Sequence, residues 1–294
     1  MKTIKRYCLE ILCVALILAI HSGLCDELVT GDNTVEDTPM PVDYTVDNAE
    51  VDLPETINSI EKTDSWRKLG EDDDGYKCFI LPYETGCKYI YTNPNGSFLL
   101  KGNCISCTKS IEGFCAVYDG DVVTVWNLHE SSCVERLPNY ALYEFQWISE
   151  LPFILRNKQN GRFGIFEPRA KKTVVFDGTV SDIFAYSSGY AAFKSKDGKW
   201  GYLDINGKTI IDPIYKGASS FNQAGLAATM LDDDTWIIIR NDGSVVSTHP
   251  YDVVLEIDDS SIICENKGAD TLTRVDIYGE HELDFDSYED DFDE

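Results

Sequence analysis

A unit of about 37 residues recurs six times along the central part of this 294-residue chain. The clearest copy runs from Gly198 to Met230, and its Trp200 serves as a marker for the position of the repeat. The equivalent positions in chain order, spaced 36, 38, 37, 36 and 36 residues apart, are Tyr89, Val125, Phe163, Trp200, Trp236 and Leu272. A register held this closely predicts tandem copies of one supersecondary unit.

Each unit is expected to consist of four short β-strands. In the clearest copy two apolar-rich runs, 199–204 and 208–211, are joined by Ile205-Asn206-Gly207, a strong hairpin signal because Asn and Gly tolerate positive φ. A third strand is expected over 216–221 and a fourth over 226–231. No segment between residues 65 and 279 shows a long helical period, so the sequence predicts an all-β fold.

The marker position is expected to be core. It holds Tyr, Val, Phe, Trp, Trp and Leu, which share no hydrogen-bonding group. Packing in a core tolerates such variation, whereas a specific ligand contact would require the same group in each repeat. The alternative is a repeated aromatic platform for a ligand. We expect these side chains to be buried in a shared interior, with Gly164 and Gly201 beside them allowing another backbone to approach.

The motif Gly-Lys-Trp-Gly-Tyr-Leu-Asp, followed by Gly-Lys, Pro-x-Tyr and Gly-Leu-Ala over residues 198–228, resembles the WG repeat family. The resemblance is strong for 198–230, moderate for 160–195 and 234–279, and weak for 87–158, where the Trp-Gly pair is lost. It implies tandem β repeats, common in exported or scaffold proteins, and no catalytic residues. About six four-stranded units favour a closed, propeller-like ring over an open β-solenoid, because closure leaves no exposed edges.

The ends of the chain differ from the repeats in composition. Residues 1–25 combine Lys2, Lys5 and Arg6 with a ten-residue apolar run, which predicts a secretory signal peptide and is too short to span a bilayer. Residues 26–64 are predicted to be an acidic disordered linker, 65–279 the WG-like β-repeat domain, and 280–294 an acidic disordered tail. The protein is therefore expected to be secreted or in the cell envelope. A lipid tether at Cys25 is the alternative to signal cleavage.

The net charge of −26, from 51 acidic and 25 basic residues, excludes some classes of partner. Nucleic-acid binding needs Lys and Arg to replace phosphate counterions, and docking on anionic lipid has the same requirement. We therefore expect no nucleic-acid partner, and the short apolar run of residues 11–20 leads us to expect no integral membrane span.

Six cysteines fall between residues 78 and 133, and behind an export signal they predict up to three disulfides of unknown connectivity. The cysteines expected to form them are Cys78, Cys87, Cys104, Cys107, Cys115 and Cys133. Metal or redox chemistry at Cys104-Ile-Ser-Cys107 is the competing interpretation. Cys264 is expected to be a small buried hydrophobe.

No catalytic motif is recognisable in the sequence. The acidic runs 71–74 and 232–234 lack the spacing of a calcium loop and are expected to be turns and solvated faces. His129, His249 and His281 are isolated in sequence. We predict a non-enzymatic binding or scaffold module for an unknown protein or glycan, with no cofactor and no metal. The alternative is a secreted or envelope enzyme acting on glycans through a carboxylate site built from loops.

Overall fold

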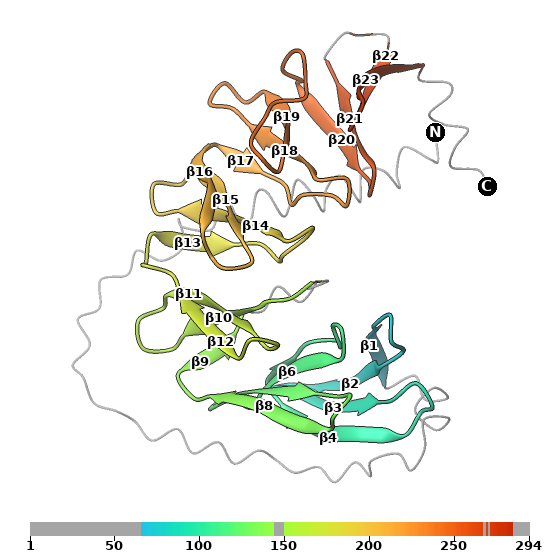
Figure 1. Ribbon diagram of the computed structural model, residues 1–294, viewed down its shortest axis with the longest axis vertical. Helices are drawn as coiled ribbons and strands as arrows, with labels where there is room; N and C mark the ends of the chain where they lie inside the picture. Colours follow the sequence, from blue (N-terminus) through green and yellow to red (C-terminus); the bar gives the residue numbers. More distant parts are fainter. Residues whose placement is uncertain (1–65, 144–149, 267–268, 270, 285–294) are drawn as a thin grey trace. The chain divides into compact units, whose positions relative to one another are not determined.

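The computed structural model describes residues 66–143, 150–266, 269 and 271–284, and these form six antiparallel sheets without any helix (Figure 1). The predicted all-β class is confirmed. Within these residues there is accordingly no helix long and apolar enough to cross a bilayer. The predicted signal peptide, Cys25 and the linker lie outside the described residues.

Strands that are consecutive in sequence pair within each sheet, so the chain completes one sheet before it starts the next. Sheet 1 comprises β1 (Arg67–Glu71), β2 (Lys77–Tyr83), β3 (Gly86–Thr92) and β4 (Phe98–Cys104). Sheet 2 comprises β5 (Ser106–Cys107), β6 (Phe114–Tyr118), β7 (Val123–Asn127) and β8 (Ser132–Leu137). Sheet 3 comprises β9 (Tyr140–Leu142), β10 (Phe153–Asn157), β11 (Phe163–Glu167) and β12 (Lys172–Val175).

The second half of the body follows the same order. Sheet 4 comprises β13 (Val180–Ile183), β14 (Tyr190–Ser195), β15 (Trp200–Asp204) and β16 (Thr209–Tyr215). Sheet 5 has three strands, β17 (Gly217–Ala218), β18 (Leu226–Met230) and β19 (Trp236–Arg240). Sheet 6 comprises β20 (Val253–Ile257), β21 (Ser261–Glu265), β22 (Thr271–Asp276) and β23 (Gly279–Asp284). Every ladder among the described residues stays within its own sheet, so no closed sheet is found.

The hairpin predicted at residues 205–207 joins the third and fourth strands of sheet 4. Gly207 has φ 74°, a conformation that glycine adopts without a steric penalty. The Asp204 carboxylate accepts hydrogen bonds from the backbone N–H groups of Asn206 and Lys208, both at 2.9 Å. The turn is therefore fixed by the residue at its start as well as by its glycine.

One repeat contributes strands to two sheets. The unit that begins at Gly198 supplies β15 and β16 to sheet 4, and then β17 and β18 to sheet 5. The third strand expected over 216–221 is shortened to β17, because from Ser219 onward the chain contacts the neighbouring sheet. The Tyr202 hydroxyl donates to the Ser219 carbonyl at 2.9 Å, and the Phe221 ring lies 4.5 Å from that of Tyr202.

All six marker residues lie on the third strand of their sheets, in β3, β7, β11, β15, β19 and β22. Five are buried, and Trp236 is half-buried. The predicted shared interior is divided, however: the buried side chains form five apolar cores, each made by two consecutive sheets. Five of the markers thus pack sheet against sheet, and Leu272 is buried in sheet 6.

The repeat is shifted by two residues in sheet 2. In sheet 4 the turn-capping Asp204 follows Trp200 by four residues, whereas in sheet 2 Asn127, which accepts from the Glu130 N–H at 3.2 Å, follows Val125 by only two. Val123 also pairs with the last residue of β8 as Trp200 pairs with the last residue of β16. Val123 therefore occupies the place equivalent to Trp200, and Val125, also fully buried, lies one step further along the same face.

The glycine that follows the marker allows the close backbone approach expected from the sequence. A Cβ on Gly201 would lie 2.5 Å from the Ile211 carbonyl oxygen, and one on Gly164 would lie 2.6 Å from that of Val174. Both contacts are with backbone of the fourth strand. A side chain at either position would force the two strands apart.

The last strand extends beyond the predicted end of the repeat domain at residue 279. β23 covers Gly279–Asp284, so the first residues of the predicted tail pair with β22. Glu280 is held by hydrogen bonds from the Thr248 backbone N–H, at 2.7 Å, and from the Tyr251 hydroxyl. These contacts explain why an acidic residue here belongs to the fold. Residues 285–294 lie outside the described residues.

Candidate functional site

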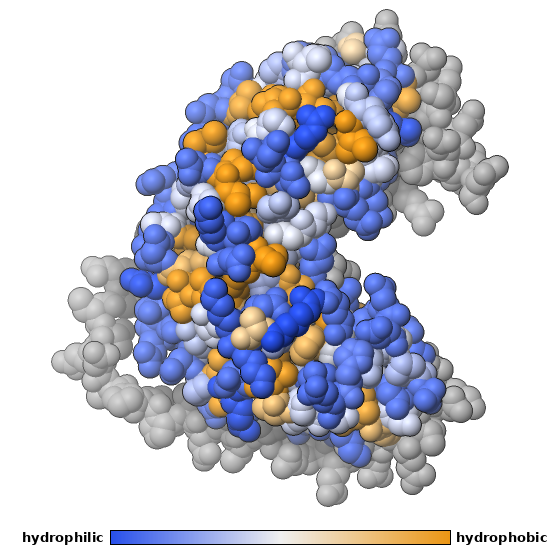
Figure 2. All heavy atoms as spheres, in the orientation of Figure 1, coloured by the Kyte–Doolittle hydropathy of each residue, from blue (hydrophilic) through white to orange (hydrophobic). Residues whose placement is uncertain are grey.

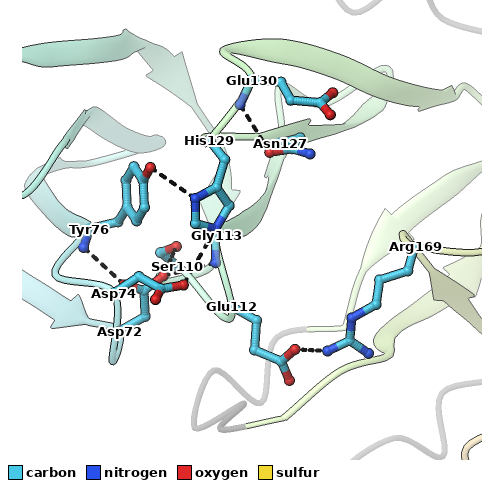
Figure 3. A network of polar contacts seen from close by, with 10 residues as sticks. All are labelled: Asp72, Asp74, Tyr76, Ser110, Glu112, Gly113, Asn127, His129, Glu130 and Arg169. Atoms are coloured by element: carbon cyan, nitrogen blue, oxygen red, sulfur yellow. Dashed lines mark hydrogen bonds and ion pairs between the residues drawn. The ribbon is translucent and has the colours of Figure 1, made fainter.

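Polar side chains from three sheets meet at one end of the strands of sheets 1, 2 and 3 (Figure 3). They come from the β1–β2 turn, the β5–β6 loop, the β7–β8 turn and the β11–β12 turn. In an antiparallel meander these connections all lie at the same end of the strands. The order of the strands therefore brings together residues that are up to about 100 positions apart.

Asp72 is the centre of the contacts between sheets 1 and 2. Its carboxylate accepts the Tyr76 N–H at 2.9 Å within its own turn. It also accepts the Ser110 hydroxyl at 2.5 Å and the Gly113 N–H at 3.0 Å from the β5–β6 loop. One carboxylate thus fixes the two loops to each other (Figure 3).

His129 lies on the β7–β8 turn and faces the β1–β2 turn. Its Nδ1 is 3.1 Å from the Tyr76 hydroxyl, its Nε2 is 3.4 Å from the Asp74 carboxylate, and its ring stands edge-on to that of Tyr76 at 4.8 Å. The ring also needs a glycine below it, because a Cβ on Gly113 would lie 2.0 Å from Nε2. Gly113 has φ 75°, so its conformation too favours glycine.

An ion pair connects the same region to sheet 3. Glu112 in the β5–β6 loop pairs with Arg169 in the β11–β12 turn, and both side chains are about half exposed (Figure 3). Glu112 has φ 52°, an uncommon conformation for a residue with a side chain. The loop is therefore held at both sides, by Asp72 and by Arg169.

Loops joining the first and second strands also touch at other junctions. Glu150 accepts the N–H groups of Ser188 and Gly189 at 2.7 and 2.8 Å, and the Ser188 hydroxyl donates to the Asn222 carbonyl at 2.7 Å. The Asn222 side-chain amide in turn donates to the Asp258 carbonyl at 2.9 Å. Hydrogen bonds between loops thus accompany the apolar cores at the junctions of sheets 3 with 4, 4 with 5, and 5 with 6.

The end of the strands that carries this network is rich in carboxylates. Asp73, Asp74, Glu112 and Glu130 are all exposed there, and we refer to these four residues as the acidic loop surface. Glu112 pairs with Arg169, whereas no described Lys or Arg pairs with Asp73 or Glu130. On the face of the molecule in Figure 2, hydrophilic side chains surround several separate hydrophobic patches.

The contacts of the network define the chemistry available to it. Ser110 is 1% exposed and its hydroxyl donates a hydrogen bond to Asp72, so it is not paired with His129 as a nucleophile would be with its base. Tyr76, His129 and Asp74 form a short polar chain at the surface. This arrangement can hold loops in place and can present negative charge to a partner.

The expectation of turns and solvated faces holds for Asp73 and Asp74 and for the run 232–234, whereas Glu71 ends β1 and Asp72 accepts hydrogen bonds from two loops. Lys68 holds Glu71, and this hydrogen bond lowers the pKa of Glu71. In the second run Asp232 pairs with Lys199, Asp234 pairs with Lys216, and Asp233 accepts the Thr235 hydroxyl at 2.6 Å. That hydrogen bond lowers the pKa of Asp233.

The structure shows no disulfide between the cysteines that it describes, all of which are free thiols. Cys87 and Cys104 face each other on β3 and β4, but their sulfurs are 3.3 Å apart, and a disulfide bond measures about 2.05 Å. Cys107 lies beside them, Cys78 and Cys115 are fully buried nearby, and Cys133 is exposed on β8. Burial raises the pKa of the Cys78 and Cys115 thiols. Cys264 is fully buried in the core between sheets 5 and 6, as expected.

Sequence reasoning missed the polar network. It singled out the acidic run 71–74 but paired it with nothing, and it treated His129 as isolated. The partners Tyr76, Ser110 and Arg169 come together only because consecutive sheets pack against each other. No local spacing in the sequence indicates these contacts.

Comparison with known proteins supports the repeat. The model of the WG containing repeat family matches residues 170–200 and 200–236. No curated protein matches the chain in sequence.

Several solved structures are similar to the chain at low identity. Hsv2p of Kluyveromyces lactis is 13% identical over 72% of this chain and 73% of that chain, with a TM-score of 0.38. An uncharacterized protein of Listeria monocytogenes is 13% identical over 76% and 83%, with a TM-score of 0.44. A eukaryotic initiation factor is 9% identical over 76% and 66%, with a TM-score of 0.48. Such likenesses transfer no function.

The matched boundary at residue 200 coincides with Trp200, the marker on β15. Residues 170–236 therefore consist of two WG-containing repeats.

Proposed function

We propose that the repeat domain is a non-enzymatic binding module that docks a basic protein segment on the acidic loop surface. The observation that carries the proposal is that exposed carboxylates gather on loops with a fixed backbone. Asp72 ties the β1–β2 turn to the β5–β6 loop at 2.5 and 3.0 Å, and Arg169 holds Glu112 from sheet 3. Loops that are ordered before binding lose less conformational entropy when a partner docks.

The charges of this surface favour a cationic partner. Asp73 and Glu130 have no described Lys or Arg partner, so a Lys or Arg of another protein could pair with them without displacing an internal ion pair. The apolar repeat positions are less suitable for recognition, because they are used between sheets: Trp200 is 4% exposed and Phe163 is 5% exposed. Recognition is therefore assigned to the loops, whose residues differ from repeat to repeat.

The test is a calorimetric titration of the full chain with a lysine-rich peptide, which measures the peptide affinity at low and at high salt. We expect binding that weakens about tenfold or more between about 0.05 and 0.3 M salt, because exposed ion pairs are screened over the Debye length. The double variant Asp73→Lys, Glu130→Lys should lose this binding. Its melting temperature should stay close to that of the native chain.

A matched control changes the same charge at the other end of the strands. Glu84 and Asp197 are exposed in turns that join second to third strands, so Glu84→Lys, Asp197→Lys should retain peptide binding. Equal loss of binding in both double variants would mean that only net charge matters and would refute a docking surface. Binding of neutral glycans instead, or hydrolysis of a labelled glycan panel, would favour the glycan-active alternative.

The proposal has two further parts that concern location and closure. We place the module outside the cytoplasm, because residues 1–25 have the composition of a signal peptide. Fractionation with mass spectrometry of the mature N-terminus tests this, and a full-length cytoplasmic chain would contradict it.

We also propose that the six sheets form a ring rather than an open solenoid. Small-angle scattering tests closure, and an elongated particle would contradict it.

A further inference from the structure

Three buried cysteines converge where sheet 1 meets sheet 2, at a place distinct from the acidic loop surface. Cys87 and Cys104 are direct partners across β3 and β4, and Cys107 ends the short strand β5. Their sulfurs all lie within 4.8 Å of one another. A fourth cysteine, Cys78 on β2, is fully buried in the same apolar core.

The spacing of these sulfurs is close to that of a metal–thiolate site. At a zinc–sulfur bond of about 2.3 Å, sulfurs at the corners of a tetrahedron lie about 3.8 Å apart. The Cys87 and Cys104 sulfurs are 3.3 Å apart, and no two of the three sulfurs are more than 4.8 Å apart. Adjustments of a few tenths of an ångström to an ångström would bring three sulfurs to this geometry.

The chain around the cluster excludes water. Cys78, Cys87, Cys104 and Cys107 are 0%, 8%, 4% and 2% exposed, and they belong to one apolar core. The absence of a side chain at Gly86 lets the backbone of β4 approach, since a Cβ there would lie 2.3 Å from the Cys104 carbonyl oxygen. Structural zinc sites share such a closed, apolar surrounding.

A disulfide would pair only two of these converging thiols, whereas one metal ion can bind all of them. A bond between Cys87 and Cys104 would leave Cys107 as a third buried thiol in contact with both sulfurs. Cys104 and Cys107 also have the C-x-x-C spacing at which two neighbouring cysteines often bind one metal ion. A single ion uses all of the sulfurs at once.

We propose that Cys87, Cys104 and Cys107 bind Zn²⁺, with Cys78 as the fourth ligand. Each coordinating thiol releases its proton to solvent as the metal binds. Because three ligands come from sheet 1 and Cys107 comes from sheet 2, the ion links the two sheets. The Zn²⁺ therefore stabilises the junction between sheets 1 and 2.

The full chain, purified with a reductant and without chelator, tests the proposal. After incubation with Zn²⁺ and desalting, we expect about one zinc per chain by elemental analysis. X-ray absorption at the zinc edge should show sulfur ligands at about 2.3 Å. Cys87→Ser and Cys107→Ser should lower zinc affinity at least tenfold.

Two controls separate the site from general thiol binding. Cys115→Ala removes a buried thiol of the same core, and Cys133→Ser removes the exposed one; both should retain the full zinc content. Loss of zinc in these controls, or no bound zinc in the native chain, would overturn the proposal. A native mass about 2 Da low per bond under non-reducing conditions, with these thiols resistant to alkylation, would assign disulfides instead and also overturn it.

Discussion

Two junctions, between sheets 1 and 2 and between sheets 4 and 5, have the same frame of hydrogen bonds between hydroxyl and backbone groups. They differ in some of the side chains that are buried within this frame. In the first, the Tyr91 hydroxyl donates to the Thr108 carbonyl, and in the second, the Tyr202 hydroxyl donates to the Ser219 carbonyl. The hydroxyl of the residue after the short strand accepts a backbone N–H at 3.0 Å in both, from Ala116 and from Ala228. These contacts align the two junctions residue by residue.

The fillings are different. Cys104 ends β4 where Tyr215 ends β16, and Cys107 ends β5 where Ala218 ends β17. The junction of sheets 4 and 5 is filled by rings, among them Trp200, which lies 4.6 Å from the Phe184 ring. The frame of hydroxyl and carbonyl contacts thus persists, and both junctions keep buried rings, Tyr89 and Tyr91 in the first, while Cys104 and Cys107 stand in the places of Tyr215 and Ala218.

The largest expected effect tests the aromatic filling. Trp200→Ala should lower the free energy of unfolding by about 3–5 kcal/mol, because it removes a large buried ring and leaves a cavity. Cys104→Ala, measured in zinc-free protein, should cost only about 1 kcal/mol because it removes a single sulfur. Urea titration of both variants checks the difference, and an unchanged curve for Trp200→Ala would refute the core role of the marker.

A smaller effect is expected from the glycine beside the marker. Gly201→Ala should cost about 1–3 kcal/mol, because the new Cβ would meet backbone atoms of Ile211 and Pro213 at 2.5 and 2.8 Å. Gly198→Ala is no suitable control because φ is 80° there. Ala191→Gly, the reverse change at a buried strand position, is expected to cost about 1 kcal/mol and provides the comparison of thermal unfolding. If Gly201→Ala melted at the native temperature, close approach would not explain the Trp-Gly pair.

The shared frame predicts similar effects at the two junctions. Tyr202→Phe and Tyr91→Phe each remove one donor and leave a carbonyl oxygen unsatisfied, at a cost of about 1–2 kcal/mol. Both variants should be measured by urea unfolding in zinc-free protein. Costs that differ by more than about 1 kcal/mol would show that the frame is not equivalent.

The smallest effect concerns pH at a third junction, between sheets 5 and 6. Partial burial acts to raise the pKa of Asp258, but hydrogen bonds from Ser261 and Ser260 outweigh it, and the pKa is lowered. A carboxyl with a depressed folded pKa stabilises the fold above its unfolded pKa, and this contribution is lost as the pH falls through the folded value. Asp258→Asn should therefore flatten the acid limb of a plot of stability against pH, by less than about 1 kcal/mol. An acid limb as steep as that of the native chain would contradict the assignment.

Much of the fold could be predicted because the spacing of apolar residues and the turn residues of each repeat are local features of the sequence. The spacing of the markers places all six on third strands, and Asn206-Gly207 predicts a turn that the structure contains. Gly164 and Gly201 indicate close approach because a glycine in a strand interior needs such a reason. Periodicity and turn chemistry act over a few residues and are visible in one sequence.

Contacts between sheets could not be predicted in the same way. The position of Val125 was two residues out because sheet 2 lacks the Trp-Gly pair that fixes the alignment elsewhere. Glu280 looked like part of an acidic tail, although Thr248 and Tyr251 hold it in a strand. His129 meets Asp74 only after two sheets have packed together. Such partners are determined by the packing of consecutive sheets, which local patterns in a single sequence do not indicate.

Because a repeat starts at the third strand of one sheet and ends in the second strand of the next, the natural places to divide the protein are not the repeat boundaries. A fragment that began at Trp200 would carry half of sheet 4 with bare edges, whereas one that began between β12 and β13 would keep the sheet whole. The same geometry makes growth by duplication simple: an added copy completes the half-finished sheet before it and leaves another half-finished sheet for its successor.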